Sequence, residues 1–185
     1  MSSRPPYRVL RSWVVFKGPI RNALHRLKYR RNRGFGETLA FHLAVYVDSL
    51  AWDVDTVIPI PLSAQRLAER GYNQVAVVAK PLALLNGWKY MPKGLERTRH
   101  THSQVGLGVQ ERQENVRGAF RAGQIVKTRS RLLTDEVATT GATLAVASQA
   151  LVDAGARQVY ALTIAKALSR YGSDSILNTP FRPLR

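Results

Sequence analysis

The sequence predicts an α/β domain with a central parallel sheet flanked by helices. Residues 53–61 are rich in β-branched residues and end in prolines, which is typical of a buried strand that ends in a loop. The apolar segment 131–137 precedes a helical pattern over 142–154, and 158–165 again reads as a strand. A strand, a helix and a strand in this order predict a right-handed parallel crossover.

Further elements are predicted on both sides of residues 53–61. Pro19 opens an amphipathic helix with Ile20, Leu24 and Leu27 on one face, and a second helix is expected over residues 36–50. A third helix is predicted over 73–86, with a disruptive proline at position 81.

The chain divides into a basic N-terminal hood region over 1–50, a core over 51–167 and a tail over 168–185. Within the core, residues 92–118 lack hydrophobic periodicity and are crowded with Arg, His, Gln, Ser and Gly, so a long mobile loop is expected there.

Composition excludes several classes of protein. With 185 residues and 45% hydrophobic residues, the chain is long enough for one ordinary domain. The absence of cysteine excludes disulfides, thiolate zinc sites and iron-sulfur clusters, and it is compatible with the cytoplasmic location that we expect. No apolar run approaches the length of a membrane span. No P-loop, dinucleotide-binding, zincin or α/β-hydrolase motif is present.

The net charge of +16 favours a polyanionic partner such as nucleic acid or a phosphorylated metabolite. Residues 1–36 hold ten Lys or Arg and no acid, interleaved with aromatic residues. An organellar transit peptide would share this charge pattern, and that alternative stays open.

The strongest functional signal lies in residues 132–143, LLTDEVATTGAT. An apolar strand delivers Asp135 and Glu136 to its C-terminal end, where ligands of open α/β sheets bind. The following turn and helix start predict a phosphate site, because backbone N–H groups, threonine hydroxyls and a glycine meet there. The residues expected to bind the ligand are Ala138, Thr139, Thr140, Gly141, Ala142 and Thr143.

The two acids suit ribose hydroxyls or Mg²⁺, so Asp135 and Glu136 are also the candidate metal ligands. Alternatively, Thr139 or Thr140 only caps the helix.

Several basic residues could hold a diphosphate. Arg66 and Arg70 are four residues apart, just past a predicted strand end, although a solvated helix face would look the same. Arg97 and Arg99 are candidates for closing over a ligand. Lys28 and Tyr29 could contribute to a substrate hood, or they could equally be packing and surface residues. His100 and His102 do not predict a metal site, because no third ligand at a suitable spacing accompanies them.

Six segments in order resemble the ComF family, whose members have the type I phosphoribosyltransferase fold. They cover roughly residues 20–166 and comprise Lys28-Tyr29, residues 58–62 (IPIPL), 66–74 (RLAERGYNQ), Arg97-Thr98-Arg99 with Thr101 and Gln104, Glu111-Arg112 with Asn115-Val116, and residues 135–143. Three departures stand out: the family's N-terminal four-cysteine zinc ribbon is missing, Glu136 replaces a usual aspartate, and His102 replaces a usual proline.

The resemblance implies that the chain binds phosphoribosyl diphosphate (PRPP) with Mg²⁺ and without zinc. The implied reaction transfers phosphoribosyl to a nitrogen acceptor, a nucleobase or amine, with release of pyrophosphate. Asp135, Glu136, Arg66, Arg70 and Arg99 are the residues implied to carry it. Two alternatives remain: a competence-associated protein that binds single-stranded DNA or protein partners with little turnover, and a PRPP-sensing regulator.

Overall fold

The computed structural model describes residues 5–29, 33–98, 118–123 and 130–168 of the chain. Its centre is a five-stranded sheet in the order β1-β7-β6-β2-β3, in which all neighbouring strands pair in parallel. The predicted α/β class with a central parallel sheet is therefore confirmed. The strands are β1 (Val9–Val15), β2 (Thr56–Pro59), β3 (Lys89–Tyr90), β6 (Ser130–Ala138) and β7 (Gln158–Lys166).

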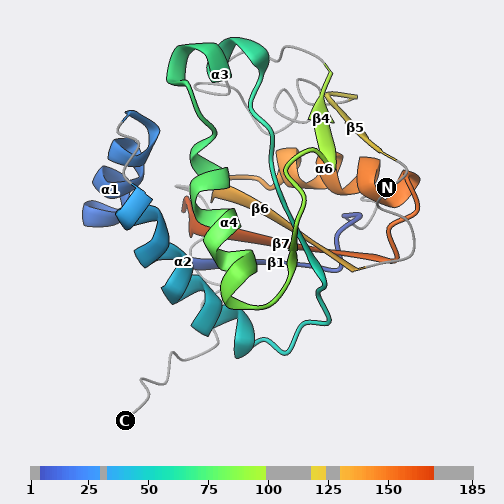
Figure 1. The fold of residues 1–185 in the computed structure, drawn as a ribbon, viewed down its shortest axis with the longest axis horizontal. Coiled ribbons are helices and arrows are strands. Elements are labelled where there is room, and N and C mark those ends of the chain that lie inside the picture. The colour runs from blue at the N-terminus through green and yellow to red at the C-terminus, as the bar shows by residue number, and fades with distance from the viewer. Residues whose placement is uncertain (1–4, 30–32, 99–117, 124–129, 169–185) are drawn as a thin grey trace.

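Helices cover both faces of this sheet (Figure 1). On one face lie α1 (Gly18–Tyr29), α2 (Arg33–Asp48) and α4 (Gln74–Leu85), whose apolar side chains form one core cluster with Leu132 and Leu162 of the sheet. On the other face lies α6 (Ala142–Asp153), which packs with Leu133 and Ala161 in a second cluster. The remaining elements are α3 (Ala64–Arg70) and a two-stranded antiparallel ribbon of β4 (Leu95–Arg97) and β5 (Phe120–Ala122).

Two segments differ from the sequence-based expectation. Residues 9–15, assigned to the N-terminal hood, form edge strand β1 and pair with β7, so this part of the hood region belongs to the central sheet. Residues 95–97, assigned to the mobile loop, form β4 because Leu95 is buried and the strand pairs with β5. The rest of the expected loop, from 99 to 117, and nearly all of the tail lie outside the described residues.

Helix α4 continues through Pro81, contrary to the expected disruption. Proline has no N–H, so the Val77 carbonyl lacks its usual helical donor four residues later. Gly36 of α2 lies against this point: a Cβ on Gly36 would stand 2.9 Å from the Val77 carbonyl oxygen. The absence of a side chain at Gly36 therefore lets α2 and α4 approach closely.

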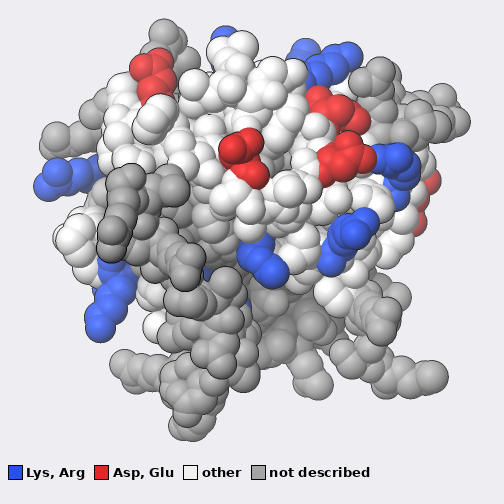
Figure 2. Space-filling model, turned by 90° about the horizontal axis from the view of Figure 1, so that it is seen from below, with Lys and Arg blue, Asp and Glu red and all other residues white. Residues whose placement is uncertain are grey.

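One side of the described surface shows how the charged side chains are distributed. Figure 2 shows that the side of the molecule away from α3 carries acidic and basic side chains interspersed among uncharged ones. The basic surplus of the sequence therefore forms no continuous patch on the described part of that side. No helix among the described residues has the length and apolarity needed to cross a bilayer.

Candidate functional site

The strand order creates a crevice between β2 and β6. The chain passes from β2 through α3 and α4 to β3 on one side, and from β6 through α6 to β7 on the other. Ligands of open α/β sheets bind where the strand order reverses in this way, beyond the carboxyl ends of the strands. A cleft of about 600 Å³ lies at this position.

The cleft brings together most of the residues singled out in the sequence. Its lining includes Asp135 and Glu136 at the end of β6, Arg66 and Arg70 from α3, and Lys28 and Tyr29 from α1. Ala138, Thr139, Gly141, Ala142 and Thr143 also line it, whereas Thr140 is exposed next to it. Arg97 of β4 lines the cleft as well, and Arg99 lies outside the described residues.

The segment after β2 is held in place by two capping residues. Ser63 accepts a 3.3 Å hydrogen bond from the backbone N–H of Arg66 and so caps α3. Asn73 caps α4 by accepting from the Val75 N–H, and its side-chain amide donates to the Ile60 carbonyl at 2.9 Å. These bonds fix α3 over the cleft, so that Arg66 and Arg70 face it.

The turn between β6 and α6 has the shape of an anion site. Gly141 adopts a left-handed conformation with φ of 79° and occupies the N-cap position, where no side chain caps the helix. A Cβ at this position would lie 3.2 Å from the Tyr7 hydroxyl. The predicted capping alternative is present in part, because the Thr140 hydroxyl accepts a 3.3 Å hydrogen bond from the Ala142 N–H.

The two acids of β6 have different surroundings. Successive side chains in a strand point to opposite faces, and Glu136 points toward α4, where the side chain of Gln74 donates to its Oε2 at 3.2 Å. Its Oε1 lies 3.2 Å from Nζ of Lys28. Asp135 points to the other side, toward Arg97, which favours the charged form of this carboxyl.

Burial perturbs the ionisation of three groups in the cleft. It raises the pKa of Asp135 to about 7, and it also raises the pKa of Glu136 against the opposing charge of Lys28. Burial and the charge of Arg66 lower the pKa of Arg97, whose guanidinium carbon lies 5.3 Å from the centre of the Phe120 ring. Such perturbed groups in a cleft are typical of functional sites.

The described residues contain no group of three or more His, Asp or Glu side chains that could hold a metal by themselves. Mg²⁺ is commonly bound by one or two carboxylates together with substrate phosphates. Asp135 fits this mode, because it lines the cleft and because the neighbouring N–H group and positive charges do not offset the cost of burying its ionised carboxylate. Glu136 fits less well, because its Oε2 accepts a hydrogen bond from Gln74 and its Oε1 is paired with the charge of Lys28.

The role of Gln74 was not predicted. The residue ends the RLAERGYNQ segment, and its side chain joins Glu136 to Arg70, whose Nη1 donates to Gln74 Oε1 at 3.0 Å. Its position directly after the cap residue Asn73 was the available signal, because it places the side chain in the first turn of a helix that faces the strand ends.

The chain is similar in sequence to several named proteins. DNA utilization protein YhgH of Escherichia coli O6:H1 is 28% identical over 169 residues, which cover 89% of this chain and 74% of that protein. The Salmonella typhi protein of the same name is 29% identical with the same coverage. Competence protein F of Haemophilus influenzae is 28% identical over 157 residues, covering 80% of this chain and 69% of that protein. No family model matches the chain. These homologues confirm the predicted resemblance to the ComF proteins.

Two solved structures are similar to part of the chain. Glutamine phosphoribosylpyrophosphate amidotransferase from B. subtilis has a TM-score of 0.47 and 20% identity. An allosteric regulatory enzyme of purine biosynthesis has a TM-score of 0.46 and 19% identity. They match 76% and 70% of this chain, which spans only 26% and 25% of their own lengths.

Proposed function

We propose that this homologue of competence protein F binds PRPP as its Mg²⁺ complex and transfers the phosphoribosyl group to a nitrogen acceptor. The observation that carries the proposal is the cleft at the reversal of strand order, where a glycine-led helix start, a recessed carboxyl and three arginines line one volume. A phosphate, a ribose and a diphosphate are the three parts of PRPP, and each has a chemically matched partner in this cleft.

The 5-phosphate is assigned to the turn formed by residues 138–143. The left-handed Gly141 lets an anion approach the backbone, and the positive end of the α6 dipole favours negative charge there. Thr139 and Thr143 line the same wall and add hydroxyl groups.

The ribose is assigned to the end of β6, and the diphosphate is assigned to the arginines of α3 and β4. Asp135 accepts hydrogen bonds from the ribose hydroxyls, and the guanidinium groups of Arg66, Arg70 and Arg97 bind diphosphate oxygens. A bound Mg²⁺ would neutralise charge on the diphosphate. Arg99 and a direct role of Glu136 in holding the ligand or metal stay predictions from the sequence.

In the proposed reaction, the bond between the anomeric carbon and the diphosphate oxygen breaks, and a bond from that carbon to the acceptor nitrogen forms. The electron pair of the broken bond leaves with pyrophosphate, and the nitrogen loses its proton to solvent. The arginines stabilise the charge that develops on the leaving group, while Asp135 stabilises the positive sugar, so positioning and electrostatics supply the catalysis.

A pyrophosphate-release assay across a panel of nucleobases and amines tests this function. Release that depends on one acceptor class and on Mg²⁺ is the expected result. PRPP binding without release for any acceptor would instead indicate a PRPP-sensing protein, and absence of PRPP binding would contradict the proposal.

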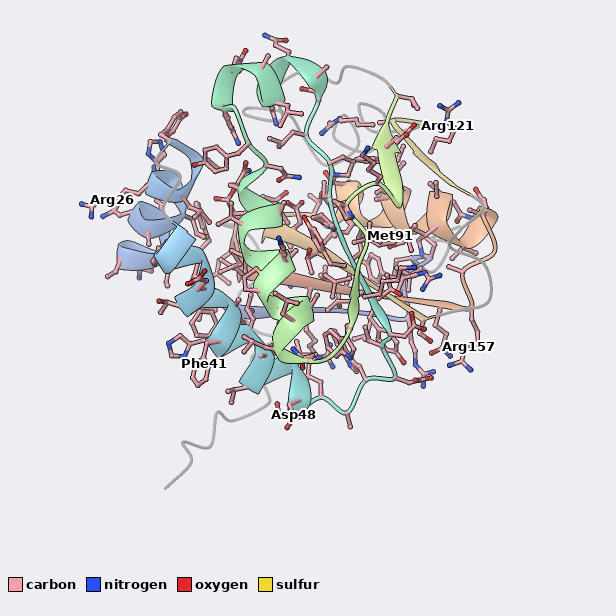
Figure 3. All side chains as sticks on the ribbon, viewed as in Figure 1. Arg26, Phe41, Asp48, Met91, Arg121 and Arg157 are labelled. Carbon is pink, nitrogen blue, oxygen red and sulfur yellow. The ribbon has the colours of Figure 1, made fainter. Side chains whose placement is uncertain are left out.

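A second candidate function, binding of single-stranded DNA, rests on the exposed face of α1. Arg21, His25 and Tyr29 are exposed at successive helical turns, and the rings of His25 and Tyr29 are 5.0 Å apart. Arg26 projects from the same helix away from the body of the protein (Figure 3). Basic groups bind phosphates and exposed rings stack on bases, and relatives of the chain are named DNA utilization proteins. Affinity for an oligothymidine that falls steeply with salt and is lost in Arg21→Ala/Tyr29→Ala would support it; unchanged affinity in this variant would contradict it.

A further inference from the structure

The Glu136 carboxylate connects three elements of the fold. It extends from β6, it meets Lys28 of α1 at 3.2 Å through Oε1, and it meets Gln74 of α4 at 3.2 Å through Oε2. Glu136 is only 4% exposed. Oε2 therefore accepts a hydrogen bond within the protein, and Oε1 is paired with Lys28 by charge but accepts no hydrogen bond from the described residues.

The contact with Lys28 lies in the last turn of α1. Leu27 in this same turn and Leu24 in the preceding turn are buried in the core, and the Tyr72 hydroxyl donates to the Leu27 carbonyl. Tyr29, the last residue of α1, lines the cleft and has 67% of its surface exposed. Only Lys28 and Tyr29, the two residues that follow Leu27 in α1, extend beyond this apolar attachment to line the cleft.

We propose that Glu136 is a positioning residue, which holds the last turn of α1 at the cleft through Lys28, while its neighbour Asp135 contacts the ligand. The assignment of Asp135 to the ligand rests on the proposed function, whereas the attachment of α1 does not. Side-chain length matters to this role. An aspartate at position 136 would withdraw the carboxylate by about 1.5 Å, which separates it from Lys28 and Gln74 while it keeps the charge.

The test is Glu136→Asp, because it distinguishes a positioning carboxylate from a ligand-binding one. Amide hydrogen exchange of residues 18–29 is measured without ligand in wild type, Glu136→Asp, Lys28→Met and the double variant. Lys28→Arg keeps the charge, and Lys17→Met, at an exposed lysine outside the cleft lining, is the matched control.

Glu136→Asp and Lys28→Met are each expected to speed exchange in the last turn of α1 by about tenfold, with no further increase in the double variant. Lys28→Arg and Lys17→Met are expected to exchange like wild type. Wild-type exchange in Glu136→Asp, or additive effects in the double variant, would overturn the proposal.

A second measurement separates this proposal from the function itself. Titration with PRPP and Mg²⁺ is expected to give Glu136→Asp an affinity within about threefold of wild type, because Asp135 is intact. Loss of binding in Glu136→Asp with unchanged exchange in α1 would assign Glu136 to the ligand and contradict the positioning role. If wild type itself binds no PRPP, the proposed function fails, and the exchange data still decide how α1 is held.

Discussion

Oδ1 of Asp135 accepts a 2.7 Å hydrogen bond from the backbone N–H of Glu136, the next residue of the same strand. This bond and the charges of Lys28 and Arg97 favour the ionised carboxyl, but burial outweighs them and raises its pKa from 3.8 to about 7. The cleft therefore contains a carboxyl whose charge is poorly compensated in the unliganded protein, and this has a consequence for stability.

The free energy of unfolding is expected to depend on pH through Asp135. Its pKa is higher in the folded state than in the unfolded state, so the folded protein binds more protons between about pH 4 and pH 7, and stability falls as the pH rises through that window. Asp135→Asn removes this titration. We expect it to stabilise the protein more at pH 8 than at pH 5, by at least about 1 kcal/mol. Urea denaturation at both pH values measures the difference, with Glu37→Gln as an exposed control; the same effect of Asp135→Asn at both values would contradict the assignment.

Gly141→Ala is expected to lower both the stability of the protein and its affinity for the ligand. Alanine at a positive φ costs about 1 kcal/mol in any such position, and at Gly141 the new Cβ also lies 3.2 Å from the Tyr7 hydroxyl. Gly87→Ala is the matched control, since its φ is 67° and a Cβ there meets nothing within 4 Å. Gly141→Ala should lose at least as much stability in urea as Gly87→Ala, but only Gly141→Ala should lose affinity for ribose 5-phosphate. Equal affinities in the two variants would remove the turn from the phosphate site.

Arg66→Met is expected to weaken the binding of pyrophosphate about tenfold or more, because a charge-assisted hydrogen bond to an anion contributes about 1.5–3 kcal/mol. Affinity for ribose 5-phosphate should change by less than about threefold. Arg121→Met is the control: Arg121 pairs with Glu96 on the surface at 3.4 Å and projects from the ribbon of β4 and β5 (Figure 3). Titration calorimetry with the two ligands compares the variants. An equal loss for both ligands would contradict a diphosphate role for Arg66.

Gly36→Ala is expected to destabilise the protein by about 1–3 kcal/mol, as overpacking of a close contact does. The added Cβ would meet the Val77 side chain and stand 2.9 Å from its carbonyl oxygen. Urea denaturation measures the loss, and Val77→Ala in the same chain should relieve part of it by removing the contact with the side chain. Wild-type stability of Gly36→Ala would show that α2 and α4 can separate without cost.

The sequence predicted the elements whose hydrophobic pattern is strong. Strands β2, β6 and β7 and helix α6 lie where the apolar runs indicate, and the cleft forms at the predicted strand ends. The hydrophobic pattern did not predict β1, because basic residues interrupt its apolar residues and its partner, β7, lies more than 140 positions later in the chain. Pairing over such a separation leaves no local signal.

The sequence predicted most of the residues that line the cleft, but it did not predict that Asp135 and Glu136 have different surroundings. Adjacent carboxylates in a strand must point to opposite faces, yet only the packing of α1 and α4 shows that Lys28 and Gln74 meet Glu136. The sequence also did not predict that the Asp135 carboxyl is recessed or that burial raises its pKa.

Titration of PRPP with Mg²⁺ into wild type and Asp135→Asn measures whether the recessed carboxyl of β6 binds the ligand. Wild type is expected to bind, and Asp135→Asn to bind at least about 30-fold more weakly, which corresponds to about 2 kcal/mol. Circular dichroism should show an intact fold in Asp135→Asn, and Glu37→Gln should bind like wild type. Equal affinities of wild type and Asp135→Asn, or no binding to wild type, would contradict it.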